Sequence, residues 1–248
     1  MAFSDQNHTA VVHDGLLAAL PPEDLARLGP RLQPVELPFD QTIFPADSTL
    51  DAVHFVESGM ASLLATLDGG EQIVEVGIAG RDGMIGLPLV FGDDRSLVEA
   101  RVQLEGTALR IGAAAFRAAM DESAALRGVL TRYALAFHVQ VTLTAACNAR
   151  HPIEQRLSRW LLIAHDRAGV DEFPMTHEFI SMMLGVRRPG VSLAAGVLQK
   201  AGLIHYVRGR MEVTDRPGLE TASCECYHTA RREFARLLGG SGAAARPG

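Results

Sequence analysis

The period of the hydrophobic pattern changes near residue 112, and this change limits the folds that the chain can adopt. Beyond residue 112, apolar residues recur at every third or fourth position, which is the helical period. Before it, short apolar runs of strand length alternate with glycine-containing turns, at 35–37, 52–56, 61–66, 72–78, 97–104 and 108–111. Short strands with Gly-rich turns are typical of a small antiparallel sandwich or barrel. The sequence therefore predicts an α+β chain.

Helices are expected on both sides of the strand block. A short helix is predicted over 16–28, where Pro21-Pro22-Glu23-Asp24 indicates a helix start, and others over 113–120 and from about 123 to 149. The last of these carries a seam with alternating spacings of four and three residues, formed by Leu126, Leu130, Tyr133, Phe137, Gln140, Thr144 and Cys147. Such a seam packs either on the chain's own barrel or on a second copy. The spacing alone leaves both open.

Composition restricts the class of partner. The chain has 248 residues, of which 48% are hydrophobic, and a formal net charge of −6. This balance is that of an ordinary globular protein, and the acidic total requires any nucleic-acid-binding surface to be local. No run approaches the roughly 20 apolar residues that cross a bilayer, and residues 1–10 lack the apolar core of a signal peptide. We expect a cytoplasmic protein without a membrane partner.

The cysteines are few and odd in number, namely Cys147, Cys224 and Cys226. They do not form a disulfide framework, which favours a reducing compartment. Cys224 and Cys226 are separated by one residue, whereas common zinc and redox motifs have two, and there is no second pair. We therefore expect unpaired thiols near a mobile C-terminus and no metal ligands. The Gly/Ala/Ser-rich tail, 239–248, is expected to be disordered.

The strongest local signal, over 175–204, is that of a helix-turn-helix. Thr176 is a predicted N-cap, Gly185 ends the first helix, and Pro189 suits the first turn of the second. The second helix then has an apolar stripe of Val191, Ala194, Ala195 and Leu198, which leaves its other face outward. Two short β segments follow and flank Arg208-Gly209-Arg210, the pattern of a wing.

The helix-turn-helix and the wing together predict a DNA-binding domain. The first residues of a recognition helix reach base edges in the major groove, where an arginine can bond guanine O6 and N7 together. The tip of a wing contacts the phosphate backbone. The candidate DNA contacts are Thr176, Arg187, Arg188, Pro189, Ser192, Lys200, Arg208 and Arg210. The alternative is a helical hairpin that packs on a partner protein, but the wing and the paired arginines favour DNA.

Over about residues 15–220 the chain resembles the Crp/Fnr family of bacterial regulators. The resemblance rests on the order of the parts and on Thr176-x-x-x-Ile180-x-x-x-Leu184-Gly185, followed by Val191 and Leu203-Ile204. It implies an N-terminal double-stranded β-helix (jelly-roll) sensor domain over 15–120, a long dimerisation helix over 121–150 and a winged helix-turn-helix over 151–220. A C-terminal helix and tail would occupy 221–248.

The resemblance also implies partners. It favours the second copy as the partner of the seam, and hence a homodimer on a palindromic promoter site, with RNA polymerase as a further partner. Arg188 matches the arginine that reads guanine in a cyclic-AMP-responsive member of the family. Pro189 and Leu193 replace the glutamate and the second arginine of that member. The preferred half-site is therefore expected to differ.

The effector positions of the family match only in part. Gly83-Met84, Arg95-Ser96 and Thr142 stand where cyclic-AMP-binding members hold the nucleotide. Met84 replaces the glutamate that holds the ribose hydroxyl, the spacing to Arg95 is one residue longer, and Val141 replaces the preceding threonine. We therefore expect an altered pocket with an unknown effector or none. The alternative is a cyclic-nucleotide-responsive activator.

Other cofactors and catalysis are not expected. The N-terminal segment lacks the cysteines of an iron–sulfur cluster, and His54, the available haem ligand, lies in an alternating strand where an exposed side chain is expected. No Gly-x-Ser-x-Gly, His-Glu-x-x-His or phosphate-binding Gly-x-x-x-x-Gly-Lys motif occurs. We predict no catalytic residues. A jelly-roll enzyme or a protein-interaction module is the alternative from another class.

Overall fold

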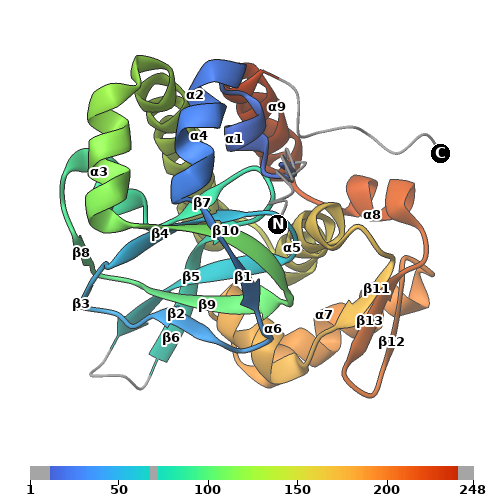
Figure 1. The fold of residues 1–248 in the computed structure, drawn as a ribbon. Helices are drawn as coiled ribbons and strands as arrows, with labels where there is room; N and C mark the ends of the chain where they lie inside the picture. The colour runs from blue at the N-terminus through green and yellow to red at the C-terminus, as the bar shows by residue number, and fades with distance from the viewer. Residues whose placement is uncertain (1–11, 68–71, 240–248) are drawn as a thin grey trace, which may run out of the picture.

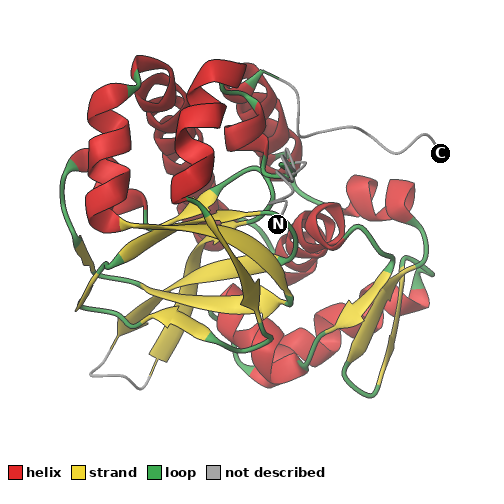
Figure 2. Cartoon of the chain, in the orientation of Figure 1, coloured by secondary structure: helices red, strands yellow, loops and turns green. Residues whose placement is uncertain are grey.

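The structure, a computed structural model, describes residues 12–67 and 72–239, and places a β-roll beside a largely helical C-terminal half (Figure 1). The tail expected to be disordered lies outside the described residues from 240 onward, as does the N-terminal segment 1–11. Helices cover one side of the β-roll, and a separate small sheet lies at the far end of the helical half (Figure 2). The α+β class and the predicted order of parts are confirmed.

Two antiparallel four-stranded sheets form the β-roll. Their orders are β1-β10-β4-β7 and β2-β9-β5-β6, and a β3-β8 pair lies beside them. The strands are β1 (Gln33–Leu37), β2 (Thr42–Phe44), β3 (Ser48–Thr49), β4 (Ala52–Val56), β5 (Met60–Leu67), β6 (Gln72–Ala79), β7 (Met84–Ile85), β8 (Arg95–Ser96), β9 (Glu99–Leu104) and β10 (Gly106–Gly112). The six predicted runs are present, whereas the two- and three-residue strands were too short to stand out.

The helices of the N-terminal half flank this roll. They are α1 (Gly15–Ala18), α2 (Pro22–Leu28), η1 (Gly29–Arg31), η3 (Leu87–Phe91), α3 (Ala113–Glu122) and α4 (Ala124–Arg150). The single helix expected over 16–28 is wrong, because the chain forms two. Asp14 caps α1 by accepting from the Leu16 and Leu17 N–H groups, and Pro21 separates it from α2. Proline cannot continue a helix from its interior but suits the start of a new one.

The long helix α4 begins as predicted, after Ser123, whose hydroxyl accepts from the Leu126 N–H. Its seam, however, packs on the chain itself. The Tyr133 hydroxyl donates to the Met84 carbonyl (3.2 Å), and Gln140 Nε2 donates to the Ile78 carbonyl (3.0 Å). The assignment of this seam to a second copy is therefore wrong, because the β-roll and the C-terminal helix satisfy its apolar and its polar members.

The C-terminal half consists of α5 (Ile153–Ala168), β11 (Glu172–Pro174), α6 (His177–Leu184), α7 (Arg188–Lys200), β12 (Ile204–Val207), β13 (Arg210–Val213), α8 (Arg216–Ala222) and α9 (Cys226–Leu238). The strands form a sheet in the order β11-β13-β12. Helix α9 returns to pack along α4 (Figure 1). Among the described residues, none of the helices combines the length and the apolarity that a membrane span requires.

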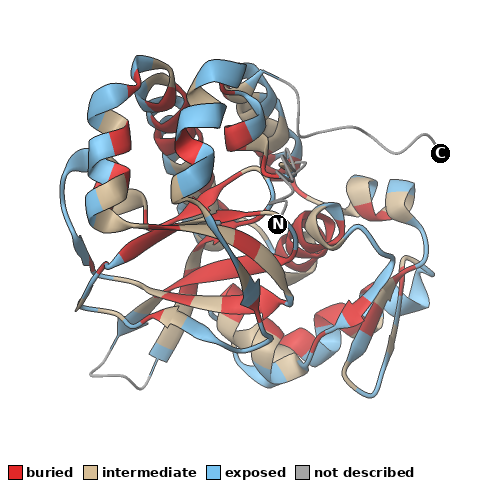
Figure 3. Ribbon diagram, in the orientation of Figure 1, coloured by how far each residue is buried: buried red, intermediate tan, exposed pale blue. Residues whose placement is uncertain are grey.

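One apolar core joins the two halves. Helix α5 is buried along most of its length (Figure 3). Leu157 and Leu161 of α5 belong to the same core cluster as Met60 and Leu64 of β5, and as the inner residues of α6 and α7. The first helix of the helix-turn-helix also lies against β6. The C-terminal half therefore packs directly against the β-roll and is not held to it by the connecting chain alone.

Candidate nucleic-acid interface

The helix-turn-helix forms where the sequence places it. Thr176 caps α6, with its Oγ1 accepting from the Phe179 N–H (3.1 Å). Gly185 ends α6 at φ 58°, a left-handed conformation that favours glycine. Pro189 lies in the first turn of α7, where its missing N–H leaves no hydrogen bond unmade. The inner face of the pair is buried and consists of Ile180, Met183, Val191, Ala194, Ala195 and Leu198.

The opposite face of α7 is open to solvent. Its exposed members include every candidate that the sequence placed there, namely Arg187, Arg188, Pro189, Ser192 and Lys200. Two large apolar side chains share this face: Leu193 is 72% exposed and Val197 is 53% exposed. These two are one helical turn apart, so they form a small apolar strip beside the basic N-terminus. The face therefore offers both cations and apolar atoms to a partner.

Arg188 has a carboxylate partner on the first helix. Its Nη2 lies 2.6 Å from Oε1 of Glu178, and both side chains are more than half exposed. An exposed pair of this kind contributes at most about 1 kcal/mol. Arg188 can therefore exchange this carboxylate for another acceptor at small cost. The Ser192 hydroxyl lies within hydrogen-bond distance of His177 Nδ1 (3.1 Å) and donates to the Arg188 carbonyl (3.2 Å), which ties the start of α7 to α6.

The wing is a tight hairpin next to this face (Figure 1). Its turn residues Arg208 and Gly209 have φ values of 50° and 79°, as a two-residue hairpin of the favoured twist requires. The Gly209 carbonyl accepts from the Met175 N–H (2.7 Å), so the tip is fixed to the start of α6. Arg208 is exposed, and Arg210 forms an ion pair with Glu172 of β11. The wing thus adds cations to the same region of the surface.

The effector candidates Gly83 and Met84 face the core. Met84 is 1% exposed, and its carbonyl accepts the Tyr133 hydroxyl hydrogen bond. A Cβ atom at Gly83 would lie 2.6 Å from that hydroxyl oxygen, so the close approach of Tyr133 requires glycine. Tyr133, itself buried, therefore occupies the space beside these two residues.

The other effector candidates lie elsewhere. Arg95 and Ser96 form β8, which pairs with β3 at a distance from β7 (Figure 1). Arg95 is exposed and faces Asp47 at 4.0 Å, while the Ser96 hydroxyl donates to the Val98 carbonyl (2.8 Å). Thr142 is exposed on α4, nine residues and about two and a half turns after Tyr133, which puts it on the opposite face. The structure does not bring the five residues together.

The histidine considered as a haem ligand is not exposed. His54 lies in β4, an interior strand between β10 and β7, and is half-buried. Burial and the neighbouring Arg110 guanidinium lower its pKa to about 4. The expectation of an exposed side chain is wrong, because strand alternation does not show that both faces of this strand are covered.

A buried carboxylate between the halves was not anticipated from sequence. Glu75 of β6 is 4% exposed and accepts hydrogen bonds from Trp160 Nε1 of α5 (2.9 Å) and from the Ser62 hydroxyl. Burial raises its pKa to about 7, against the lowering effect of these donors and of Arg159 and Arg167. In sequence, Glu75 alternates with Val74 and Val76 as a solvent-facing strand residue would. The burial of Glu75 becomes apparent only from the packing of α5 against β6.

Comparisons with known proteins agree with these parts. Residues 34–123 match the cyclic nucleotide-binding domain, and residues 155–222 match the Crp-like helix-turn-helix domain. No curated protein is a significant match to this sequence.

Three solved structures show the same fold. FixK2 from Bradyrhizobium japonicum is 15% identical, with a TM-score of 0.66, covering 78% of this chain and 98% of its own. A CRP-family transcriptional regulator from Thermus thermophilus is 16% identical, with a TM-score of 0.62 and coverages of 85% and 100%. The c-di-GMP-responsive global regulator CLP from Xanthomonas campestris is 17% identical, with a TM-score of 0.57 and coverages of 78% and 99%.

A cyclic-nucleotide-binding-type β-roll followed by a winged helix-turn-helix defines a DNA-binding transcription regulator. The chain belongs to the Crp/Fnr family of such regulators.

Proposed function

We propose that the chain acts as a homodimer on a palindromic promoter site and inserts the N-terminus of α7 into the major groove. The observation that carries the proposal is the open face of α7, where Arg187 and Arg188 lie exposed at the helix start beside the wing. Recognition helices present their first residues to base edges, and dimers read half-sites one helical turn apart.

Arg188 is the proposed base reader. Release from Glu178 leaves its guanidinium able to bond guanine O6 and N7 together. Leu193 and Val197 suit contacts with thymine methyl groups, because apolar side chains in the major groove read that group. The side chains of Pro189 and Leu193 cannot form hydrogen bonds with bases. Arg188 therefore supplies most of the hydrogen-bonded recognition of bases. The half-site therefore combines a guanine with thymines.

The remaining candidates are proposed to hold the DNA backbone. Lys200 lies at the far end of α7, and Arg208 and Arg210 lie in the wing, which suits contacts with phosphates on both sides of the groove. Thr176 and Arg187 flank the starts of the two helices, where backbone N–H groups also favour anions. Pro189 and Ser192 shape the face rather than supply charge.

The dimer is proposed to use the outer face of α4 rather than its inward seam. This face repeats at three and four residues, as a helix-pairing seam does, through Arg132, Leu135, Val139, Thr142, Ala146 and Ala149. Leu135 is 48% exposed, and the small residues toward the end of α4 permit close approach. Leu135→Glu should convert the dimer to a monomer in sedimentation, whereas Ala235→Glu on α9 should not. A wild-type monomer at micromolar concentration would contradict the dimer.

The effector pocket is proposed to be altered or absent, because Met84 of β7 and Tyr133 of α4 are both buried and are joined by a hydrogen bond. The match to the cyclic nucleotide-binding domain favours a second candidate, a cyclic-nucleotide-responsive activator. Calorimetry of the purified chain with cyclic AMP and cyclic GMP separates the two. Micromolar binding of either would establish the second candidate. A cytoplasmic location and contact with RNA polymerase at the promoter complete the proposal.

The Arg188→Ala variant tests whether α7 recognises bases in the DNA site, and Arg232→Ala is its matched control. Arg232 is an exposed arginine of α9, which lies away from α7 (Figure 1). The first variant should lose about 1–3 kcal/mol of specific binding and relax one base position, and the second should bind as the wild type does. The measurement is fluorescence anisotropy on a selected site and on single-base variants of it. Equal binding by both variants would show that α7 does not read the site.

A further inference from the structure

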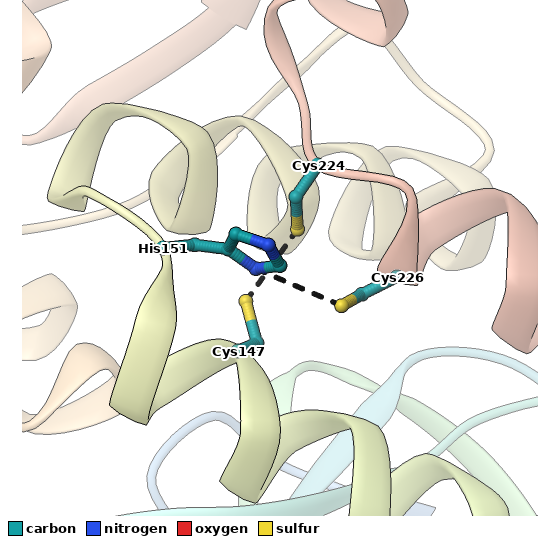
Figure 4. Close-up of side chains that lie close together, drawn as sticks. All are labelled: Cys147, His151, Cys224 and Cys226. Carbon is teal, nitrogen blue, oxygen red and sulfur yellow. Dashed lines mark hydrogen bonds between the residues drawn. The ribbon is translucent and has the colours of Figure 1, made fainter.

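Four side chains from distant parts of the sequence converge at the junction of α4, α5 and α9 (Figure 4). Cys147 lies in the last turn of α4, and His151 follows directly after that helix. Cys224 and Cys226 come from the loop before α9 and from its first residue. One ligand-type atom of each lies within 4.8 Å of all the others. The spacing of the three thiols in the sequence predicts no metal site, but the fold brings them together and buries them.

Two pairs of ligand-type atoms in this Cys/His cluster are separated as they would be around one tetrahedral ion. Cys147 Sγ and Cys224 Sγ are 3.5 Å apart, and Cys226 Sγ is 3.7 Å from His151 Nδ1. Zinc binds sulfur at about 2.3 Å and nitrogen at about 2.0 Å, so a tetrahedral site separates its ligands by about 3.5–3.8 Å. A cluster of several irons would need ligands spread over different metal atoms. The compact set therefore fits one ion.

The other ring nitrogen of His151 lies near a carboxylate. Nε2 lies 3.5 Å from Oε1 of Glu225, the residue between the two ligating cysteines. A carboxylate beside Nε2 favours the tautomer with the proton on Nε2, which leaves the lone pair of Nδ1 on the side of Cys226. Metal-binding histidines almost always have such a second partner. Nδ1, the nitrogen that faces Cys226, is thus the one available for a metal.

The charge around the cluster supports an anionic centre. Three thiolates and one divalent ion carry a net charge of −1. Arg156 and Arg159 of α5 are 8% and 6% exposed, and neither forms an ion pair with a carboxylate among the described residues, although Arg159 also acts at longer range on Glu75. Arg156 Nε donates to the Asn148 side chain, one residue after Cys147, and Arg159 Nη2 donates to the Thr144 hydroxyl, one turn before it. Buried cations are costly without an opposite charge nearby.

We propose that Cys147, His151, Cys224 and Cys226 form a structural zinc site. Three sulfurs and one imidazole nitrogen that lie close enough together to share one ion are a ligand set typical of structural zinc sites. Each thiol that binds loses its proton to solvent as its Zn–S bond forms, with no change of oxidation state. The site clamps α9 onto the end of α4, at the point where the chain enters α5. It thereby fixes the connection between the β-roll and the helix-turn-helix.

The test is the metal content of the full chain purified under reducing conditions and reconstituted with one equivalent of zinc. We expect about one zinc per chain by elemental mass spectrometry after gel filtration. His151→Ala and Cys224→Ser should lose it, while His228→Ala and Ser223→Ala, matched neighbours outside the cluster, should keep it. Zinc that stays at the wild-type level in the first two variants would overturn the assignment. So would a metal-free wild-type chain, or one with a Cys147–Cys224 disulfide in its peptide map.

Cobalt substitution keeps the test decisive if the variants do not fold. The wild-type chain loaded with Co²⁺ should show thiolate-to-cobalt charge-transfer bands and the intense visible bands of a tetrahedral ion. Their absence in the folded chain would contradict a Cys₃His site. Glu225→Gln leaves all four ligands in place and should weaken zinc binding about 10–100-fold in competition with a chelator. Unchanged affinity would remove Glu225 from the site.

Discussion

The winged helix and the β-roll differ in where they place their candidate binding residues. On α7, Arg187, Arg188 and Ser192 point outward, and the burial of the opposite face holds them there. In the β-roll, Met84 is buried and bonded to Tyr133, while Arg95 and Thr142 point to solvent in separate places. The two regions therefore differ in how their candidate residues are arranged: those on α7 share one open surface, whereas the candidate effector positions are buried or lie apart.

The largest effect is expected from removing the buried ring that packs beside Met84. Tyr133→Ala removes a buried aromatic ring and should lower the free energy of unfolding by about 3–5 kcal/mol in urea titration. Tyr133→Phe keeps the ring and loses only the hydrogen bond to the Met84 carbonyl, so it should cost about 1 kcal/mol. If the alanine variant is as stable as the wild type, Tyr133 lines an open pocket and the contrast between the two halves is lost.

The contact between the halves should be sensitive to pH. Burial raises the pKa of Glu75 to about 7 in the folded chain, from an ordinary value of 4.5. The folded state therefore holds the proton more tightly, and the contribution of Glu75 to stability is complete below about pH 4.5 and is lost as pH rises through 7. Glu75→Gln keeps an acceptor for Trp160 and a donor for Ser62 without titrating. Its stability should fall less than that of the wild type between pH 5 and 8.

The difference between the two pH curves isolates Glu75. Other carboxyls with raised pKa values, such as Asp14 and Asp82, are common to both proteins and cancel. Thermal unfolding followed by Trp160 fluorescence reports the region directly. Parallel curves would mean that Glu75 does not titrate at the contact and that the two halves are joined by apolar packing alone.

The smallest effect is expected at the wing. Arg210→Ala should weaken binding to all DNA sequences about equally and reduce the slope of log K against log salt by about 1, because one phosphate contact is lost. Fluorescence anisotropy at several salt concentrations, on specific and random duplexes, measures both quantities. A loss confined to one sequence would make Arg210 a base reader and would move specificity from α7 to the wing.

The features that sequence predicted are those built from neighbouring residues. The caps Thr176 and Gly185, the position of Pro189 and the hairpin at Arg208-Gly209 depend on local backbone chemistry, so they could be placed in advance. The strands of the β-roll followed from alternation, except where they were two or three residues long. The start of α4 followed from its cap at Ser123.

The features that sequence did not predict depend on which elements meet. The seam of α4 has the spacing of a pairing helix, yet it packs inward because α9 and the β-roll cover it. The Cys/His cluster combines a one-turn pair at the end of α4 with a pair separated by one residue far along the chain, and neither half is a recognisable motif. Glu75 gives no local sign of burial, since Trp160 lies 85 residues away.

Selection of bound sites from random DNA, run in parallel with the wild type and Arg188→Ala, tests the central claim most directly. The wild type should enrich a palindrome whose half-sites lie about one helical turn apart and share a guanine. The Arg188→Ala variant should lose preference at that guanine while keeping the spacing. The same guanine preference in both proteins, or no enriched palindrome from the wild type, would contradict the account.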